Sequence, residues 1–135
     1  MKARAVWIDG YRSVLDDGRG HSAIVDLPPD RNGADTAPMA TELTVMALAG
    51  CVTTIFKEVA VKRKFDFKGL KVELEAEKPK EASTFTKVTG NVEITTSAEE
   101  AEARTVFRLT LDICPVHVLF EKAGIKPEWR ITVKK

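Results

Sequence analysis

The sequence of 135 residues lacks the features that mark several large classes of protein. It has only two cysteines, so no framework of disulfides is expected to hold the fold together. Positive and negative side chains nearly cancel, with 21 Lys and Arg against 20 Asp and Glu, which argues against a nucleic-acid or membrane surface. No internal repeat or low-complexity segment is present. Small molecules or other proteins are therefore the expected partners.

The N-terminal segment also lacks a signal for export. Residues 1–10 carry charges and a tryptophan where a signal peptide has an uninterrupted apolar core. We therefore expect the chain to stay in the cytoplasm, where its cysteines are kept reduced. A chain of this length forms one domain of ordinary size, so we expect a single domain over residues 1–135.

The longest apolar feature is the stretch over residues 38–63, which predicts one long helix. No charged residue occurs between Glu42 and Lys57, so about four turns are apolar or small on every face, as in a helix that is buried all round. This uncharged run is shorter than the roughly 20 residues needed to cross a bilayer, which favours a core helix. A second helix, such as that of a symmetry mate, could approach Cys51 closely, because small residues surround it: Ala47, Ala49 and Gly50.

The segments on both sides of this helix predict β-strands. Three short strands separated by glycine turns are predicted before it, over residues 2–9, 11–15 and 21–27. A loop over residues 28–38 then leads into the helix. After the helix, strict alternation of apolar and polar residues predicts two long antiparallel strands with one solvated face, over residues 70–78 and 86–94. Alternation also predicts a last strand over residues 129–133.

Two shorter helices are predicted between these strands. Ser97 and Glu100 have the spacing of a capping box, which predicts a helix that starts there and ends near Ile113. Pro115 is well suited to be the first residue of another short helix. Four residues form the expected apolar stripe of this helix: Val116, Leu119, Phe120 and Ala123. This assignment leaves His117 as an exposed polar residue.

The two cysteines allow three interpretations. Taken alone, Cys51 is a small buried hydrophobic residue in a core helix. Cys114 precedes Pro115 and so occupies a helix N-cap, where unpaired N–H groups and the helix dipole lower the pKa of a thiol. In the second interpretation the two thiols form a redox pair: one reduces a peroxide and becomes a sulfenic acid, which then forms a disulfide with the other. In the third interpretation both cysteines bind a metal ion together with His21 and His117, although the cysteines are not clustered as in a zinc ribbon.

Chemistry at Cys51 would require a nearby cation. The middle of a helix offers no dipole to stabilise a thiolate, and apolar surroundings destabilise it. Arginine suits this role best, because its guanidinium is always charged and donates a fork of hydrogen bonds. The candidates are Arg19, Arg31 and Arg63. Taken singly, each also fits an ordinary surface position.

Residues 38–51, PMATELTVMALAGC, resemble the P-x-x-x-E-L-x-x-x-A-L-A-G-C signature of the OsmC/Ohr family, the osmotically inducible and organic hydroperoxide resistance proteins. The DICPV segment at residues 112–116 resembles the second-cysteine motif of the family, and the GRG turn at residues 18–20 stands where the family has a glycine-arginine segment. The resemblance, closest to the OsmC-like subgroup, covers almost the whole chain. It implies an α+β fold in which antiparallel β-sheet wraps around the long central helices of an intertwined homodimer.

The resemblance also implies an activity. Cys51 matches the peroxide-attacking cysteine, Cys114 the resolving cysteine, and Arg19 the arginine that stabilises the thiolate. The implied reaction reduces an organic hydroperoxide to an alcohol through a sulfenic acid on Cys51 and then a disulfide with Cys114. An external dithiol such as dihydrolipoamide reopens the disulfide, and no metal or flavin is needed. The alternative is a non-catalytic binding or structural domain of the same fold with inert thiols.

The sequence departs from the family pattern at one position. The catalytic arginine of the family is usually held by a glutamate ten residues before the first cysteine, where this chain has Thr41. That side chain lies about 15 Å along the helix from Cys51, so it would serve the site of the partner subunit. Glu42 comes one residue later, rotated by about 100°, and is expected mainly to stabilise the first helical turn. We therefore expect Arg19 to be held less firmly than in relatives, with modest activity or a shifted substrate preference.

Overall fold

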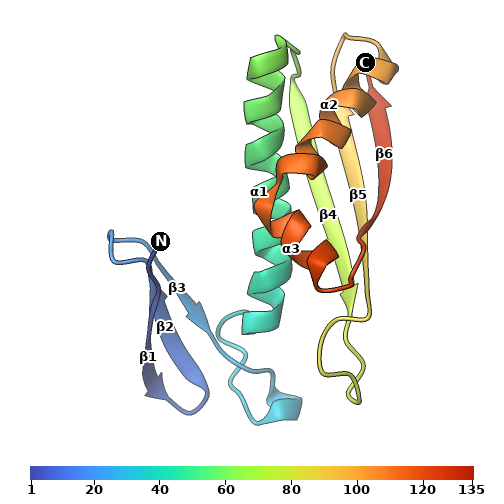
Figure 1. The fold of residues 1–135 in the computed structure, drawn as a ribbon. Helices are drawn as coiled ribbons and strands as arrows, with labels where there is room; N and C mark the ends of the chain where they lie inside the picture. Colours follow the sequence, from blue (N-terminus) through green and yellow to red (C-terminus); the bar gives the residue numbers. More distant parts are fainter. The chain divides into compact units, whose positions relative to one another are not determined.

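A computed structural model describes all residues 1–135. The chain forms two compact units, Met1–Thr44 and Val45–Lys135. Every predicted helix and strand is present, which confirms an α+β fold, whereas the single domain stays a prediction. In chain order the elements are β1 (Arg4–Asp9), β2 (Arg12–Asp16), β3 (Ser22–Val25), the short 3-10 helix η1 (Pro29–Arg31), α1 (Ala40–Arg63), β4 (Gly69–Glu77), β5 (Lys87–Thr95), α2 (Glu100–Ile113), α3 (Pro115–Lys122) and β6 (Glu128–Lys134) (Figure 1).

The N-terminal unit contains an antiparallel meander in the order β1-β2-β3. In the hairpin between β1 and β2, Gly10 has a φ of 45°, a conformation that glycine adopts without steric cost. No residue of β1 is buried, and its apolar side chains Val6, Trp7 and Ile8 are 52%, 68% and 44% exposed. Within its own unit, this small sheet therefore leaves these apolar side chains exposed.

One buried carboxylate organises the loop that precedes α1. Asp26 is 2% exposed and accepts hydrogen bonds from the Thr36 N–H at 3.1 Å, the Thr36 hydroxyl at 2.8 Å and the Leu27 N–H at 2.8 Å. The Thr36 N–H is the main reason why the pKa of Asp26 lies below its usual range, because it favours the charged carboxylate. The predicted loop is thus ordered by its own hydrogen bonds.

The helix α1 is apolar on all sides but buried on only one of them. Its buried residues are Leu48, Val52, Phe56, Val59 and Ala60. Met46 and Val61, in contrast, are 56% and 62% exposed. The expectation of burial on every face is therefore wrong for a single chain, because one small sheet and two short helices cover only one face. By length and composition α1 also passes as a membrane span, as core helices of soluble proteins do.

The C-terminal unit contains a sheet in the order β4-β5-β6. β4 and β5 are antiparallel as predicted, with Lys71, Glu73 and Glu75 exposed on one face. β5 and β6 are parallel, which the sequence analysis did not predict; α2 and α3 supply the helical crossover that a parallel pair requires. Side chains from α1, β5 and α2 supply most of the core, including Leu48, Val52, Phe56, Val88, Val92, Ile94, Ala103, Val106 and Phe107, and Cys114 and Phe120 also belong to it.

The start of α2 differs from the prediction. The helix begins at Glu100 without a side-chain cap, so the expected capping box of Ser97 and Glu100 is not formed. Instead, the buried hydroxyl of Thr96 accepts a hydrogen bond from the Ala98 N–H at 3.0 Å and donates one to the Asp66 carbonyl at 2.6 Å. These two bonds fix the turn between β5 and α2 and leave Ser97 exposed.

Candidate functional site

The structure brings the two cysteines together. Cys51 lies in the middle of α1, and Cys114 lies at the N-cap of α3 (Figure 1). Their Sγ atoms are 2.9 Å apart, with the thiol of Cys114 as donor and the sulfur of Cys51 as acceptor. Both residues are free thiols. Each sulfur is therefore placed to react directly with the other once one of them is oxidised.

The corner between α2 and α3 holds Cys114 in place. The Cys114 N–H donates to the Thr110 carbonyl at 2.9 Å, which completes α2, and its carbonyl accepts from the Val118 N–H at 3.0 Å, which begins α3. Its own backbone is extended, with φ −70° and ψ 110°, as expected before Pro115. The side chain is fully buried. The sulfur is thus fixed by the backbone on both sides and closed off from water.

Burial raises the pKa of the Cys114 thiol to about 11. The hydrogen bond donated to Cys51 acts in the same direction, because it also favours the neutral thiol. The backbone N–H groups of Val116 and His117 lower this pKa, as expected at a helix N-terminus, but burial outweighs them. The expectation that the pKa of Cys114 is lowered is therefore wrong, because the net shift is upward. At neutral pH Cys114 is a protonated donor to the sulfur of Cys51.

Cys51 is more accessible than Cys114. Its side chain is half-buried, and the preceding Gly50 is exposed. A side chain at Gly50 would meet no atom within 4 Å beyond its chain neighbours and the nearby helix backbone, so α1 is open at Gly50. The hydroxyls of Thr53 and Thr54 bond back to the Gly50 carbonyl at 2.9 and 2.5 Å. Of the two thiols, only Cys51 has part of its surface exposed.

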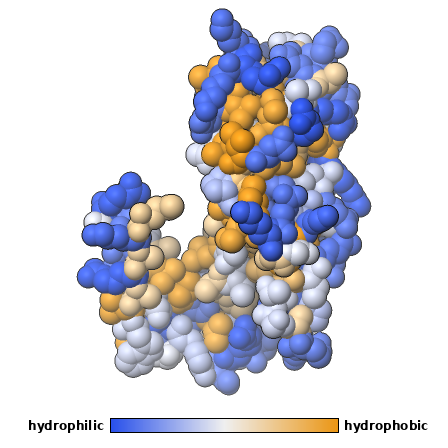
Figure 2. Space-filling model, viewed as in Figure 1, coloured by the Kyte–Doolittle hydropathy of each residue, from blue (hydrophilic) through white to orange (hydrophobic).

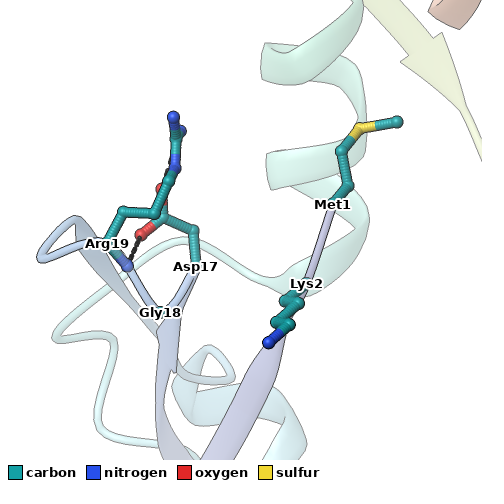
Figure 3. Close-up of a pocket in the computed structure, with 5 residues that line it drawn as sticks. All are labelled: Met1, Lys2, Asp17, Gly18 and Arg19. Carbon is teal, nitrogen blue, oxygen red and sulfur yellow. Dashed lines mark hydrogen bonds and ion pairs between the residues drawn. The ribbon is translucent and has the colours of Figure 1, made fainter.

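Arg19 lies in the N-terminal unit, in the turn between β2 and β3. Its guanidinium pairs with Asp17 at 2.9 Å, and its backbone N–H donates to the same carboxylate at 2.8 Å. The Arg19 side chain is 76% exposed. It borders an open hollow lined by Met1, Lys2, Asp17, Gly18 and Arg19 (Figure 3). Its role toward Cys51 stays a prediction.

Glu42 contributes to the start of α1. Its Oε2 accepts a hydrogen bond from the Met39 N–H at 2.8 Å, which satisfies one of the unpaired donors before the first turn. Thr41 is half-buried beside it. Of the other candidate arginines, Arg31 contacts the Met39 sulfur at 3.6 Å. The position of Glu42 in the structure agrees with the expected stabilising role in the first turn.

His117 is buried, although the sequence analysis expected an exposed residue. The buried residues of α3 are His117 and Phe120, whereas Leu119 of the expected stripe is 62% exposed. The ring of His117 packs against Trp129 of β6, with centroids 6.0 Å apart, and Phe120 stacks on Phe85 at 5.9 Å. The contacts with Trp129 and Phe85, which are distant in sequence, thus bury a different face of α3 from the one that its own sequence predicted.

The two histidines considered as metal ligands have other neighbours in the structure. No group of three or more His, Cys, Asp or Glu side chains is arranged to hold a metal ion. His21, one of the four side chains considered, pairs with Asp17 at 2.8 Å. His117 is engaged with Trp129 as described above.

Known proteins resemble this chain in sequence. Residues 33–130 match the sequence model of a family described as OsmC-like protein, a segment that includes both cysteines. Protein YhfA of Escherichia coli K12 is 29% identical over 126 residues, which cover 91% of each chain.

Solved structures resemble this chain in fold. The OsmC-like protein of Mycoplasma pneumoniae superposes with a TM-score of 0.89 at 13% identity, covering 99% of this chain and 96% of the other. An organic hydroperoxide resistance protein OsmC of Legionella pneumophila gives a TM-score of 0.76 at 17% identity, with 98% and 96% covered. At such identities the likeness shows a common fold.

Proposed function

This chain belongs to the OsmC-like protein family, and we propose that it reduces organic hydroperoxides to alcohols with its two thiols. The observation that carries the proposal is the 2.9 Å distance between the sulfurs of Cys51 and Cys114. The relative in Legionella pneumophila, named an organic hydroperoxide resistance protein, supports the choice of substrate class.

Cys51 is the nucleophile of the proposed reaction. Its thiolate attacks the distal oxygen of the hydroperoxide, so that an S–O bond forms and the O–O bond breaks. The leaving alkoxide takes up a proton and departs as the alcohol, and the sulfur is oxidised to a sulfenic acid. The thiol of Cys114 donates a hydrogen bond to the Cys51 sulfur, so the two sulfurs already face each other before the reaction. The half-buried position of Cys51 beside Gly50 gives the hydroperoxide access.

Cys114 is the resolving residue. Its sulfur attacks the sulfur of the sulfenic acid, forms the disulfide and displaces the hydroxyl group as water. An external dithiol such as dihydrolipoamide then reduces the disulfide to two thiols and is itself oxidised to a disulfide. Because its thiol is protonated and fully buried, Cys114 cannot compete with Cys51 for the hydroperoxide.

The proposed enzyme is a homodimer. Figure 2 shows apolar side chains at the surface over α1 and α2. Met46 and Val61 of α1, and Trp7 of β1, are each more than half exposed. Exposed apolar area of this extent is typical of a surface that a partner covers. Arg19, from one of the two chains, is the proposed cation beside the Cys51 thiolate.

Consumption of cumene hydroperoxide in the presence of dihydrolipoamide tests the proposal. The wild-type protein should consume the hydroperoxide through many turnovers, whereas Cys51→Ser should be inactive. The alternative, a non-catalytic domain of the same fold, predicts no consumption above that by the dithiol alone. It also predicts that Cys51 reacts with iodoacetamide no faster than free cysteine near neutral pH.

A further inference from the structure

Asp17 is the carboxylate around which the turn between β2 and β3 is built. It directly follows β2, and the turn over residues 17–21 contains Arg19. Two backbone N–H groups donate to Asp17, and the side chains of Arg19 and His21 lie within hydrogen-bond distance of it. The reaction proposed above uses Arg19 but gives no role to Asp17.

The two oxygens of this carboxylate bind different kinds of group. Oδ1 accepts hydrogen bonds from the Arg19 N–H at 2.8 Å and the His21 N–H at 3.3 Å, which stabilise the backbone of the turn. Oδ2 contacts side chains instead: Arg19 Nε lies at 3.0 Å, Arg19 Nη2 at 2.9 Å and His21 Nδ1 at 2.8 Å. An aspartate stabilises a turn through one oxygen. The second oxygen of Asp17 therefore points to a task beyond the turn, which is to hold the Arg19 side chain.

The backbone of the turn fixes the point from which Arg19 projects. Gly18 and Gly20 on either side of it have φ values of 71° and 96°, which glycine adopts without steric cost. Asp17 then holds the far end of the side chain at Nε and Nη2 (Figure 3). A long side chain that is already held loses less rotamer entropy when it binds a further group. Arg19 is thus preorganised although it is 76% exposed.

Asp17 is charged when it pairs with Arg19. The hydrogen bond from the His21 side chain is the largest cause that holds the pKa of Asp17 below its usual range, and the Arg19 N–H is the next. A charged carboxylate binds a guanidinium more strongly than a neutral acid does.

The residues near the start of α1 do not have such a contact with Arg19. Thr41 carries no charge, and the Glu42 carboxylate accepts its hydrogen bond from the Met39 N–H at 2.8 Å. The ion pair of Arg19 is with Asp17, from the same turn.

We propose that Asp17 is a positioning residue of the hydroperoxide reaction, which holds the guanidinium of Arg19 in the orientation that stabilises the Cys51 thiolate. The inference rests on the proposed function, in which Arg19 is the cation beside this thiolate. Asp17 acts through Arg19 and touches neither the sulfur nor the hydroperoxide. Its effect is opposite to that of its own charge, since a negative charge alone disfavours a nearby thiolate.

Asp17→Asn separates the two tasks of the carboxylate. The amide oxygen still accepts the backbone N–H groups of the turn, whereas the amide nitrogen replaces the oxygen that binds the Arg19 side chain. The value of kcat/KM for cumene hydroperoxide should fall by roughly threefold to fivefold, as an exposed ion pair allows. Asp9→Asn is the matched control, because it removes the pair with Arg12 in the other hairpin of the same sheet. This control should change kcat/KM by less than about twofold.

A double-mutant cycle with Arg19→Ala shows whether Asp17 acts through Arg19. In the Arg19→Ala background, Asp17→Asn should cause no further loss of kcat/KM, because the side chain that it holds is gone. A merely structural role would lower kcat/KM by the same factor in both backgrounds and would overturn the inference. Wild-type activity in Asp17→Asn or in Arg19→Ala would also overturn it, while the reaction of the two cysteines would stand.

The pH profile of Cys51 alkylation by iodoacetamide gives a readout whose sign differs between the two possible effects of Asp17. If Asp17 positions Arg19, Asp17→Asn should shift the profile to higher pH, because the thiolate loses its cation. A shift to lower pH, or none, would show that Asp17 only neutralises Arg19 or has no effect, and would overturn the inference.

Should the Asp17→Asn variant not fold, NMR spectroscopy of the wild-type protein decides. The Nε–H signal of Arg19 should differ from that of a free arginine, and a signal averaged like that of a free arginine would overturn the inference. Absence of hydroperoxide consumption by the wild-type protein would instead overturn the proposed function, and this inference with it.

Discussion

At the scale of single residues, the contact between the two sulfurs predicts a division of labour. Cys114→Ser keeps a small polar group beside Cys51 but removes the resolving thiol. This variant should consume one equivalent of hydroperoxide and then stall as a sulfenic acid, because condensation needs the second thiol. Mass spectrometry after dimedone labelling should locate the adduct on Cys51, and Cys51→Ser should not react. Equal single-turnover activity in the two variants would refute the assignment of Cys51 as the attacking cysteine and Cys114 as the resolving cysteine.

The roles of Arg19 and Glu42 can be separated in the same way. Glu42→Gln keeps an oxygen that accepts the hydrogen bond from Met39, so it should change the rate of hydroperoxide reduction little. Arg19→Ala should lower this rate by about tenfold or more, since a hydrogen bond to a charged group contributes roughly 1.5–3 kcal/mol. The measurement is kcat/KM for cumene hydroperoxide. Comparable losses in both variants would show that Glu42 holds the arginine, and no loss in Arg19→Ala would direct attention to Arg31.

The identity of the two cysteines at the site was predictable from the sequence, but the environment of each thiol was not. The motifs identified Cys51 and Cys114 as a pair, because the resemblance rests on local strings of residues. Their contact depends on how α1 meets the corner between α2 and α3, which no local pattern contains. The expected lowering of the pKa of Cys114 considered only the helix end, and burial by distant residues reversed it.

At the scale of elements, the close contact between β5 and β6 depends on Gly90, which lies opposite Trp129. A side chain at Gly90 would overlap the ring of Trp129, which is itself fixed between Phe107 and His117. Gly90→Ala should therefore lower the free energy of unfolding by about 1–3 kcal/mol, the usual cost of overpacking. Asn91→Ala, at the exposed neighbouring position, should change it by no more than about 0.5 kcal/mol. Urea unfolding of both variants gives the comparison, and equal stabilities would contradict this packing.

Elements with long regular patterns were predicted well, and short ones less so. β4 and β5 alternate over nine residues each, so their pairing and their buried face follow from the sequence. α3 has only eight residues, and the contacts of His117 and Phe120 with other elements decide which face is buried. The parallel pairing of β6 with β5 joins segments far apart in the chain, and the alternation within each strand does not specify it.

At the scale of the whole molecule, the exposed apolar side chains predict an obligate homodimer. Trp7, Met46 and Val61 would be buried by a second copy, and their exposure would destabilise an isolated chain. Sedimentation velocity at micromolar concentration should show a dimer. Val61→Glu should weaken it, because the charge would be buried on association, whereas Glu75→Gln on the exposed face of β4 should not. A monodisperse, folded monomer would refute the prediction.

The central claim is that the paired thiols form a redox cycle driven by organic hydroperoxide. The most direct test is peptide mass spectrometry of the reduced protein after one equivalent of cumene hydroperoxide, without dithiol. The account predicts that the peptide containing Cys51 becomes linked to the peptide containing Cys114, that the chain loses two hydrogen atoms in mass, and that dihydrolipoamide restores both thiols. Two free thiols and unconsumed hydroperoxide in the folded protein would contradict it.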